Sequence, residues 1–67
     1  MSIVRVTEIS SSSNKGFDDA IEKGIKRAAK TIRNMEGAWV QDQKLVIKKG
    51  KITEYRVNMK ISFVLDD

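Results

Sequence analysis

The chain has 67 residues, 40% of them hydrophobic, and carries 13 Lys and Arg against 9 Asp and Glu, a formal net charge of +4. It contains no Cys and no His, which excludes disulfide bonds, thiolate or imidazole metal sites, and the common catalytic nucleophile and base pairs. Chains this short bury only about 60% of their unfolded surface, so self-association is the expected supplement to the core.

The excess of positive charge raises the question of nucleic-acid binding, and its distribution argues against it. Lys and Arg are spread along a predicted helix and a predicted hairpin, without aromatic residues forming a stacking series among them. The N-terminal segment lacks the apolar core of a signal peptide, and no run approaches the about 20 apolar residues that span a bilayer. We therefore expect a cytoplasmic protein without nucleic-acid or membrane partners, a basic nucleic-acid binder being a minor alternative.

The first predicted element is a strand from Ile3 to Ile9, where β-branched residues mostly alternate with polar ones. Four serines, Ser10 to Ser13, and Asn14 follow. A serine run before a helix resembles a phosphate-binding motif, but turn and cap chemistry is the more common role of such residues. We therefore expect a loop here.

An amphipathic helix is predicted from Phe17 to Met35, a span of roughly five turns. Apolar residues recur there at intervals of three and four: Phe17, Ile21, Ile25, Ala28, Ile32 and Met35. Asp19 with Lys23 and Glu22 with Lys26 are favourable pairs one turn apart on its solvated face.

The rest of the chain predicts a hairpin. Strand two is expected from Ala38 to Lys48, and Lys49-Gly50 forms a tight turn because Gly readily adopts positive φ. The last strand alternates without interruption, with one face formed by Thr53, Tyr55, Val57, Met59, Ile61, Phe63 and Leu65. Strand two has apolar residues on both sides, which predicts contact with another subunit. The sequence thus predicts one α+β domain, residues 1–67, in β-α-β-β order, with the helix covering the last strand.

Four segments of the chain occur in a distinctive order and spacing: Val4–Ile9, Phe17–Ala20 after the serine run, Ala29–Asn34 and the strand Glu54–Phe63. In these segments the chain resembles the dodecin family. This resemblance implies a three-stranded antiparallel sheet wrapped around one long helix, and a hollow homododecameric shell. It also implies a non-enzymatic storage role, since many dodecins bind flavins in pairs at twofold interfaces.

Flavin-binding dodecins carry a stacking Trp just after the helix and a Gln after the Tyr of the last strand. Gly37 and Arg56 occupy these two positions. Trp39 lies two residues beyond Gly37, so in an unbroken strand it projects from the same face, about 6.6 Å further along. It is predicted to stack on a flavin, to fill the vacated pocket or to anchor an interface, and a contact with Arg56 across the hairpin would close the site.

The remaining candidate ligand residues are Gln41 and Gln43, which share the parity of Trp39 and could bond a planar ligand or line a wet interface. The expected cofactor is riboflavin or FMN, and Arg56 is a candidate partner for a flavin phosphate. No catalytic or metal-binding motif is present. The alternative is a flavin-free shell with a structural or calcium-binding role, because some dodecins without the Trp bind calcium. Asp66-Asp67 could then contribute where several tails meet on a symmetry axis.

Overall fold

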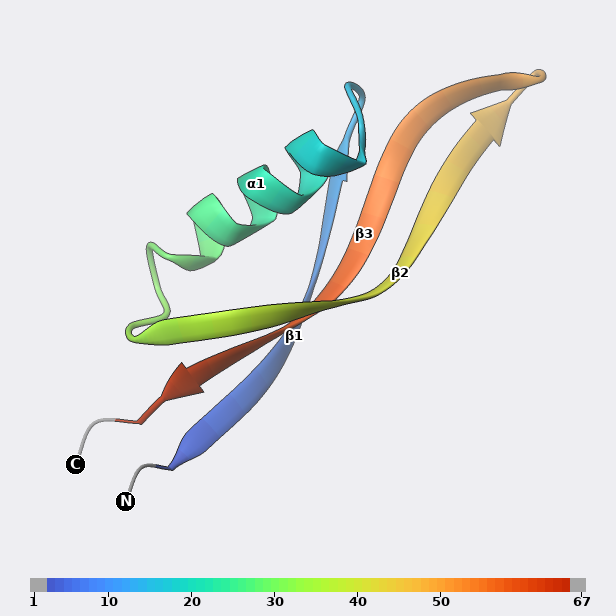
Figure 1. Ribbon diagram of the computed structural model, residues 1–67. Coiled ribbons are helices and arrows are strands. Elements are labelled where there is room, and N and C mark those ends of the chain that lie inside the picture. Colours follow the sequence, from blue (N-terminus) through green and yellow to red (C-terminus); the bar gives the residue numbers. More distant parts are fainter. Residues whose placement is uncertain (1–2, 66–67) are drawn as a thin grey trace.

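The computed structural model describes residues 3–65 and shows one helix lying on a three-stranded antiparallel sheet (Figure 1). The elements follow one another as β1 (Val4–Ser13), α1 (Phe17–Ala28), β2 (Met35–Lys48) and β3 (Lys51–Val64). The strand order in the sheet is β1-β3-β2, so β3 is central and pairs with both edge strands. The predicted β-α-β-β order and α+β class are confirmed.

The core forms on the alternating face of β3, as the sequence pattern predicts. Val57, Met59 and Ile61 are fully buried beneath α1. The ring of Phe17, at the start of α1, meets the ring of Tyr55 edge to face, with centroids 5.2 Å apart and planes at 82°. Such pairs contribute about 0.5–1.5 kcal/mol beyond the area they bury, so this contact fixes the start of the helix on the sheet.

Small residues make the closest contact between α1 and the sheet. Ala20, Gly24 and Ala28, spaced four apart, are the buried positions of the helix. The larger Ile21 and Ile25 flank this line and are only half-buried. A helix that contacts a sheet through small side chains can approach the sheet backbone closely. The helix α1 packs over β1 and β3 rather than over β2.

The helix ends at Ala28, so the prediction of a helix continuing to Met35 was wrong. Beyond it the amides of Lys30 and Thr31 donate to carbonyls only three residues earlier, which tightens the last turn. Asn34 then adopts a left-handed conformation with φ 63°, and its carbonyl accepts a hydrogen bond from the Val64 amide at 3.0 Å. Pairing with β3 therefore overrides the helical periodicity of this segment.

The serine run belongs to β1, which reaches Ser13 instead of ending at Ile9. The residue before α1 is Gly16, which provides no side-chain cap. Ser13 is buried; its hydroxyl donates to the carboxylate of Asp19 and accepts from the Lys15 amide at 2.9 Å. The serines thus extend the strand, and Ser13 fixes the entry to the helix through Asp19.

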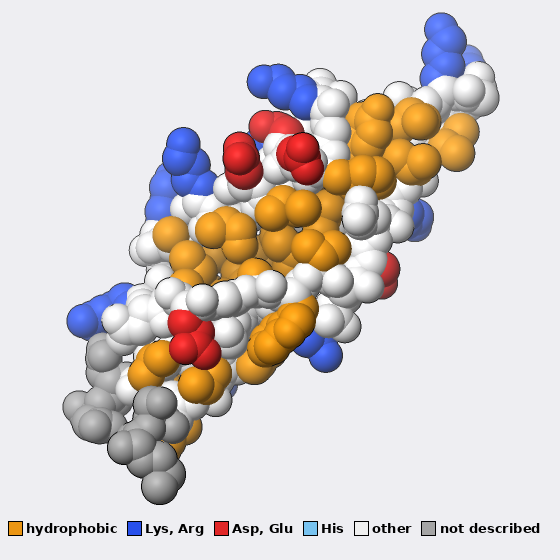
Figure 2. All heavy atoms as spheres, viewed as in Figure 1, with side chains coloured by type: hydrophobic (Ala, Val, Ile, Leu, Met, Phe, Trp, Pro, Cys, Tyr) orange, Lys and Arg blue, Asp and Glu red, His pale blue; other side chains and the backbone are white. Residues whose placement is uncertain are grey.

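The β2–β3 hairpin projects beyond the helix and gives the chain an elongated shape (Figure 1). Its tight turn at Lys49-Gly50 is confirmed, with φ 52° and 75°. The Cα radius of gyration is 13.9 Å, against about 11 Å for a compact domain of this length. All residues of β2 except Met35 and Val46 are exposed, and hydrophobic side chains run across the visible face and out along the hairpin (Figure 2).

Candidate ligand-binding site

The sheet has a second face, turned away from α1, which we call the outer face. Residues paired across antiparallel strands project from the same side of a sheet. Because Val57, Met59 and Ile61 point toward α1, the alternate residues of β3 and their partners form the outer face. Three consecutive rows of this face, each read from β1 through β3 to β2, are Glu8–Lys60–Trp39, Ser10–Asn58–Asp42 and Ser12–Arg56–Lys44.

Trp39 is the prominent apolar side chain of these rows. It pairs with Lys60, and Gly37 pairs with Ser62, so both β2 residues lie on the outer face as the parity of the sequence predicts. Trp39 is 55% exposed, a large value for an indole. A Cβ built on Gly37 would meet only Ser62 Oγ, at 3.5 Å, which is an ordinary contact. The indole therefore stands beside a position without a side chain and with room for one.

The predicted alignment of Gln41 and Gln43 with Trp39 is wrong for Gln43. The pairing of β2 with β3 shifts between Val40 and Asp42, which makes Gln41 the extra residue of a β-bulge. After the bulge the parity is inverted, and Gln43 pairs with the buried Val57 on the α1 side. Gln41 therefore remains next to Trp39 along the strand, whereas Gln43 leaves the outer face of its own chain.

The bulge places Asp42 on the outer face, where sequence parity alone did not predict it. The Asn58 side-chain amide donates to the Asp42 carboxylate at 2.7 Å. This pair lies in the row next to Trp39 and offers further side-chain oxygens to a ligand. Asp is uncommon within strands, and this is the only feature of the sequence that could have indicated Asp42 as a residue of the site.

Arg56 lies on the same outer face as Trp39 but does not contact it within one chain. It pairs with Lys44, whereas Trp39 pairs with Lys60, four residues further along β3. Four residues of strand correspond to about 13 Å. The Arg56 guanidinium instead bonds the Glu54 carboxylate at 3.3 Å. The predicted guanidinium–indole contact is therefore absent from the described chain, and Arg56 and Lys44 form a separate positive row.

The acidic side chains of residues 3–65 do not gather into a group of three or more that could hold a metal ion. Asp66 and Asp67, considered above as calcium ligands, lie outside the described residues. Within the described part of the chain, no helix has the length and apolar character needed to cross a bilayer. The outer face thus presents an exposed indole, a polar row and a positive row, which suits a flat ligand with a polar or anionic tail.

A family model for dodecin matches residues 3–66, nearly the whole chain. The chain belongs to the dodecin family. Dodecin from Streptomyces davaonensis is 36% identical, with 98% of this chain and 97% of that chain covered and a TM-score of 0.93. The structure of dodecin from Streptomyces coelicolor is 29% identical over 98% of this chain and 94% of that chain, with a TM-score of 0.94. The resemblance seen in the sequence is confirmed.

A third similar structure is a calcium dodecin from Mycobacterium tuberculosis, described as calcium-chelating and as having a novel calcium-binding site. It is 25% identical, with 96% of this chain and 91% of that chain covered and a TM-score of 0.83. No curated protein matches the sequence. Dodecins are non-enzymatic binding proteins that bind flavins and form homo-oligomers, and a calcium-binding member shares this fold.

Proposed function

We propose that this protein is a non-enzymatic homo-oligomeric shell that binds a flat aromatic ligand of the flavin type. The observation that supports this is the exposed indole of Trp39 beside Gly37 on the outer face. Stacking on an aromatic side chain contributes about 1–3 kcal/mol for a flat base, and a flavin ring offers a larger surface. Trp39 side chains of two adjacent subunits would enclose the ligand and exclude water from it.

The rows next to Trp39 supply the polar contacts of the proposed site. Gln41 and the Asp42–Asn58 pair bond the polar edge of the ring. A ligand lying along the strands directs its tail toward Arg56 and Lys44, whose charges favour the phosphate of FMN over the uncharged tail of riboflavin. Gln43 lies on the α1 side and is left out of the proposed site.

Self-association follows from the shape of the chain. The buried apolar core consists of Ala20, Ala28, Val57, Met59 and Ile61, a small set for an independent domain. The radius of gyration of 13.9 Å shows that the chain does not fold into a compact body. Large apolar side chains of β2, including Val40 and Leu45, remain exposed. A shell of twelve subunits, each the single domain 1–67, would bury this surface; we place the assembly in the cytoplasm.

Calcium binding is the second candidate, supported by one observation. Asp42 and Asn58 present adjacent side-chain oxygens on the outer face, and a similar structure is a calcium dodecin. Calcium takes six to eight oxygen ligands, so one pair is insufficient and several subunits would have to contribute. A shell of this kind would use Trp39 as an interface anchor.

A fluorescence titration distinguishes the two candidates. Riboflavin fluorescence should fall on binding, because stacking on an indole quenches the excited flavin. Trp39→Ala should weaken riboflavin binding by about ten- to a hundredfold while the assembly persists, in line with the energy of aromatic stacking. Lys30→Ala changes an exposed residue beyond the end of α1, away from the outer face, and serves as the control. If riboflavin does not bind but calcium binds the assembly in calorimetry, the calcium candidate replaces the flavin one.

A further inference from the structure

The tip of the β2–β3 hairpin carries unpaired positive charge next to exposed apolar side chains. Ile47 pairs with Ile52 and Lys48 pairs with Lys51, so the isoleucine pair and the lysine pair project from opposite faces of the hairpin, and Lys49 lies in the turn. Ile47 is 60% exposed and Ile52 48%. Among residues 3–65, none of these lysines has an ion-pair partner. We call these five residues the hairpin tip.

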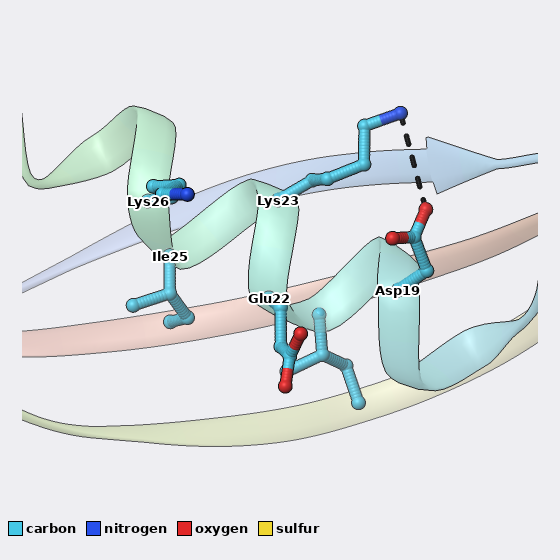
Figure 3. Close-up of a pocket in the computed structure, with 6 residues that line it drawn as sticks. Asp19, Glu22, Lys23, Ile25 and Lys26 are labelled. Atoms are coloured by element: carbon cyan, nitrogen blue, oxygen red, sulfur yellow. Dashed lines mark ion pairs between the residues drawn. The ribbon is translucent and has the colours of Figure 1, made fainter.

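One edge of α1 carries the complementary pattern. Asp18 and Glu22 lie one turn apart, and so do the half-buried Ile21 and Ile25 beside them. Figure 3 shows Glu22 and Ile25 projecting from the same side of α1, in a groove that Ile21 also lines. We call these four residues the acidic edge.

The acidic edge is unpaired within the described chain. The predicted pair Asp19–Lys23 is confirmed at 4.0 Å (Figure 3), whereas the predicted pair Glu22–Lys26 is not formed. Neither Asp18 nor Glu22 has an ion-pair partner in residues 3–65. Their charge therefore remains free to meet a cation from outside the chain.

We propose that the hairpin tip of one copy of this chain docks on the acidic edge of a second copy. Paired residues of adjacent strands lie about 4.5–5.5 Å apart, and residues one turn apart on a helix about 5–6 Å, so the Lys48–Lys51 pair matches the spacing of the Asp18 and Glu22 carboxylates. The tip belongs to a hairpin that extends past the helix (Figure 1), which directs it away from its own chain.

The second copy is favoured over other anionic partners because the chain itself supplies both halves of the contact. The hairpin tip is positive and the acidic edge is negative, and among residues 3–65 neither surface forms an ion pair. The two surfaces are different, so the contact is heterologous, and such contacts close into rings or shells when the rotation permits. The inference rests on the proposed self-association and identifies the surfaces that carry it.

Charge reversal and charge exchange test the docking. Lys48→Glu with Lys51→Glu should weaken association of the intact chain at least about tenfold, because close interfacial charge pairs couple by about 1.5 kcal/mol or more. Asp18→Lys with Glu22→Lys should weaken it similarly. A chain carrying all four changes should recover most of the wild-type association, since opposite charges face each other again. Sedimentation velocity measures the association, and circular dichroism verifies that each variant is folded.

The matched control is Arg5→Glu with Lys30→Glu, which makes the same change in net charge at exposed sites outside both surfaces. Its association should stay within about twofold of wild type. Equal weakening in the control, or failure of the fourfold variant to recover, would overturn the docking while leaving the shell intact. Binding of the tip to phosphatidylserine vesicles or to a DNA duplex, with assembly insensitive to Lys48 and Lys51, would also overturn it. A wild-type monomer would instead refute the shell itself.

Discussion

A Cβ atom placed on Gly24 of α1 would lie 2.8 Å from Cε of Met59 in β3. It would also lie 2.9 Å from Cβ of Ser11 in β1, so the helix backbone packs against both strands with no room for a side chain. The Met59 methyl is the flexible end of its side chain, whereas the Ser11 Cβ is fixed to the backbone. Close approach at this one position holds the helix against the sheet.

Gly24→Ala is therefore expected to destabilise the protein. Overpacking costs about 1–3 kcal/mol, and the upper part of that range, about 2–3 kcal/mol, applies because the Ser11 Cβ is fixed to the backbone. The better helix propensity of Ala recovers about 1 kcal/mol, which leaves a net loss of about 1–2 kcal/mol. Urea denaturation at one fixed subunit concentration measures this loss. Gly37→Ala is the control, because its Cβ meets only an ordinary contact with Ser62. A Gly24→Ala variant as stable as the wild type would show that the helix can shift at no cost.

Ser13→Ala is expected to cost about 1–2 kcal/mol of unfolding free energy. The buried hydroxyl of Ser13 joins the Asp19 carboxylate to the Lys15 amide, and its removal leaves both without this partner. Ser12→Ala removes an exposed hydroxyl from the adjacent position and should change stability by no more than about 0.5 kcal/mol. Equal effects of the two changes would contradict a special role for Ser13.

A strand of this fold could be predicted from the sequence where burial of one face requires apolar and polar residues to alternate. Val57, Met59 and Ile61 are fully buried, and the pattern that predicted β3 is the pattern that the core requires. The end of the helix was not predictable in this way. Ile32 and Met35 continue the helical spacing, but the pairing of Asn34 with Val64 and of Met35 with Phe63 assigns that segment to the sheet. Such contacts join residues about 30 positions apart and leave no local signal.

The candidate site was predictable in part for a similar reason. Gly37 and Trp39 precede the bulge, so their parity was read correctly. Gln43 follows it, and one inserted residue moved its side chain to the opposite face. The sequence gives no sign of a bulge at Gln41, because neither Val40 nor Gln43 is restricted to one face of the sheet by its side chain. The sequence therefore identified the indole but missed the Asp42–Asn58 pair beside it.

Arg56→Gln is expected to reduce the preference of the protein for FMN over riboflavin. The change removes a positive charge from the row that faces the proposed phosphate, where a partly exposed ion pair contributes up to about 1 kcal/mol. The dissociation constant for riboflavin divided by that for FMN should fall by up to about fivefold, while the affinity for riboflavin is maintained or increased. Parallel fluorescence titrations with both flavins measure the ratio. Lys30→Gln is the control for lost charge, and a ratio unchanged by Arg56→Gln would place the phosphate elsewhere.

Gly37→Trp is expected to strengthen flavin binding by about tenfold or more. Gly37 does not have a positive φ, and its Cβ position is open, so a side chain fits without backbone strain. A second indole beside Trp39 adds stacking surface worth about 1–3 kcal/mol. Calorimetric titration with riboflavin measures the gain, and Gly37→Leu controls for added apolar area without a ring. Weaker binding in Gly37→Trp would show that the ligand or a second subunit already occupies this space.

The proposed function has two parts, a closed shell of subunits and flavin binding through Trp39. Native mass spectrometry of the purified protein mixed with excess riboflavin tests both parts at once, because one spectrum reports subunit number and bound ligand together. We expect a species of twelve subunits carrying several flavins, with the flavins lost in Trp39→Ala. A bare assembly would contradict the flavin site, and a bare monomer would contradict the shell as well.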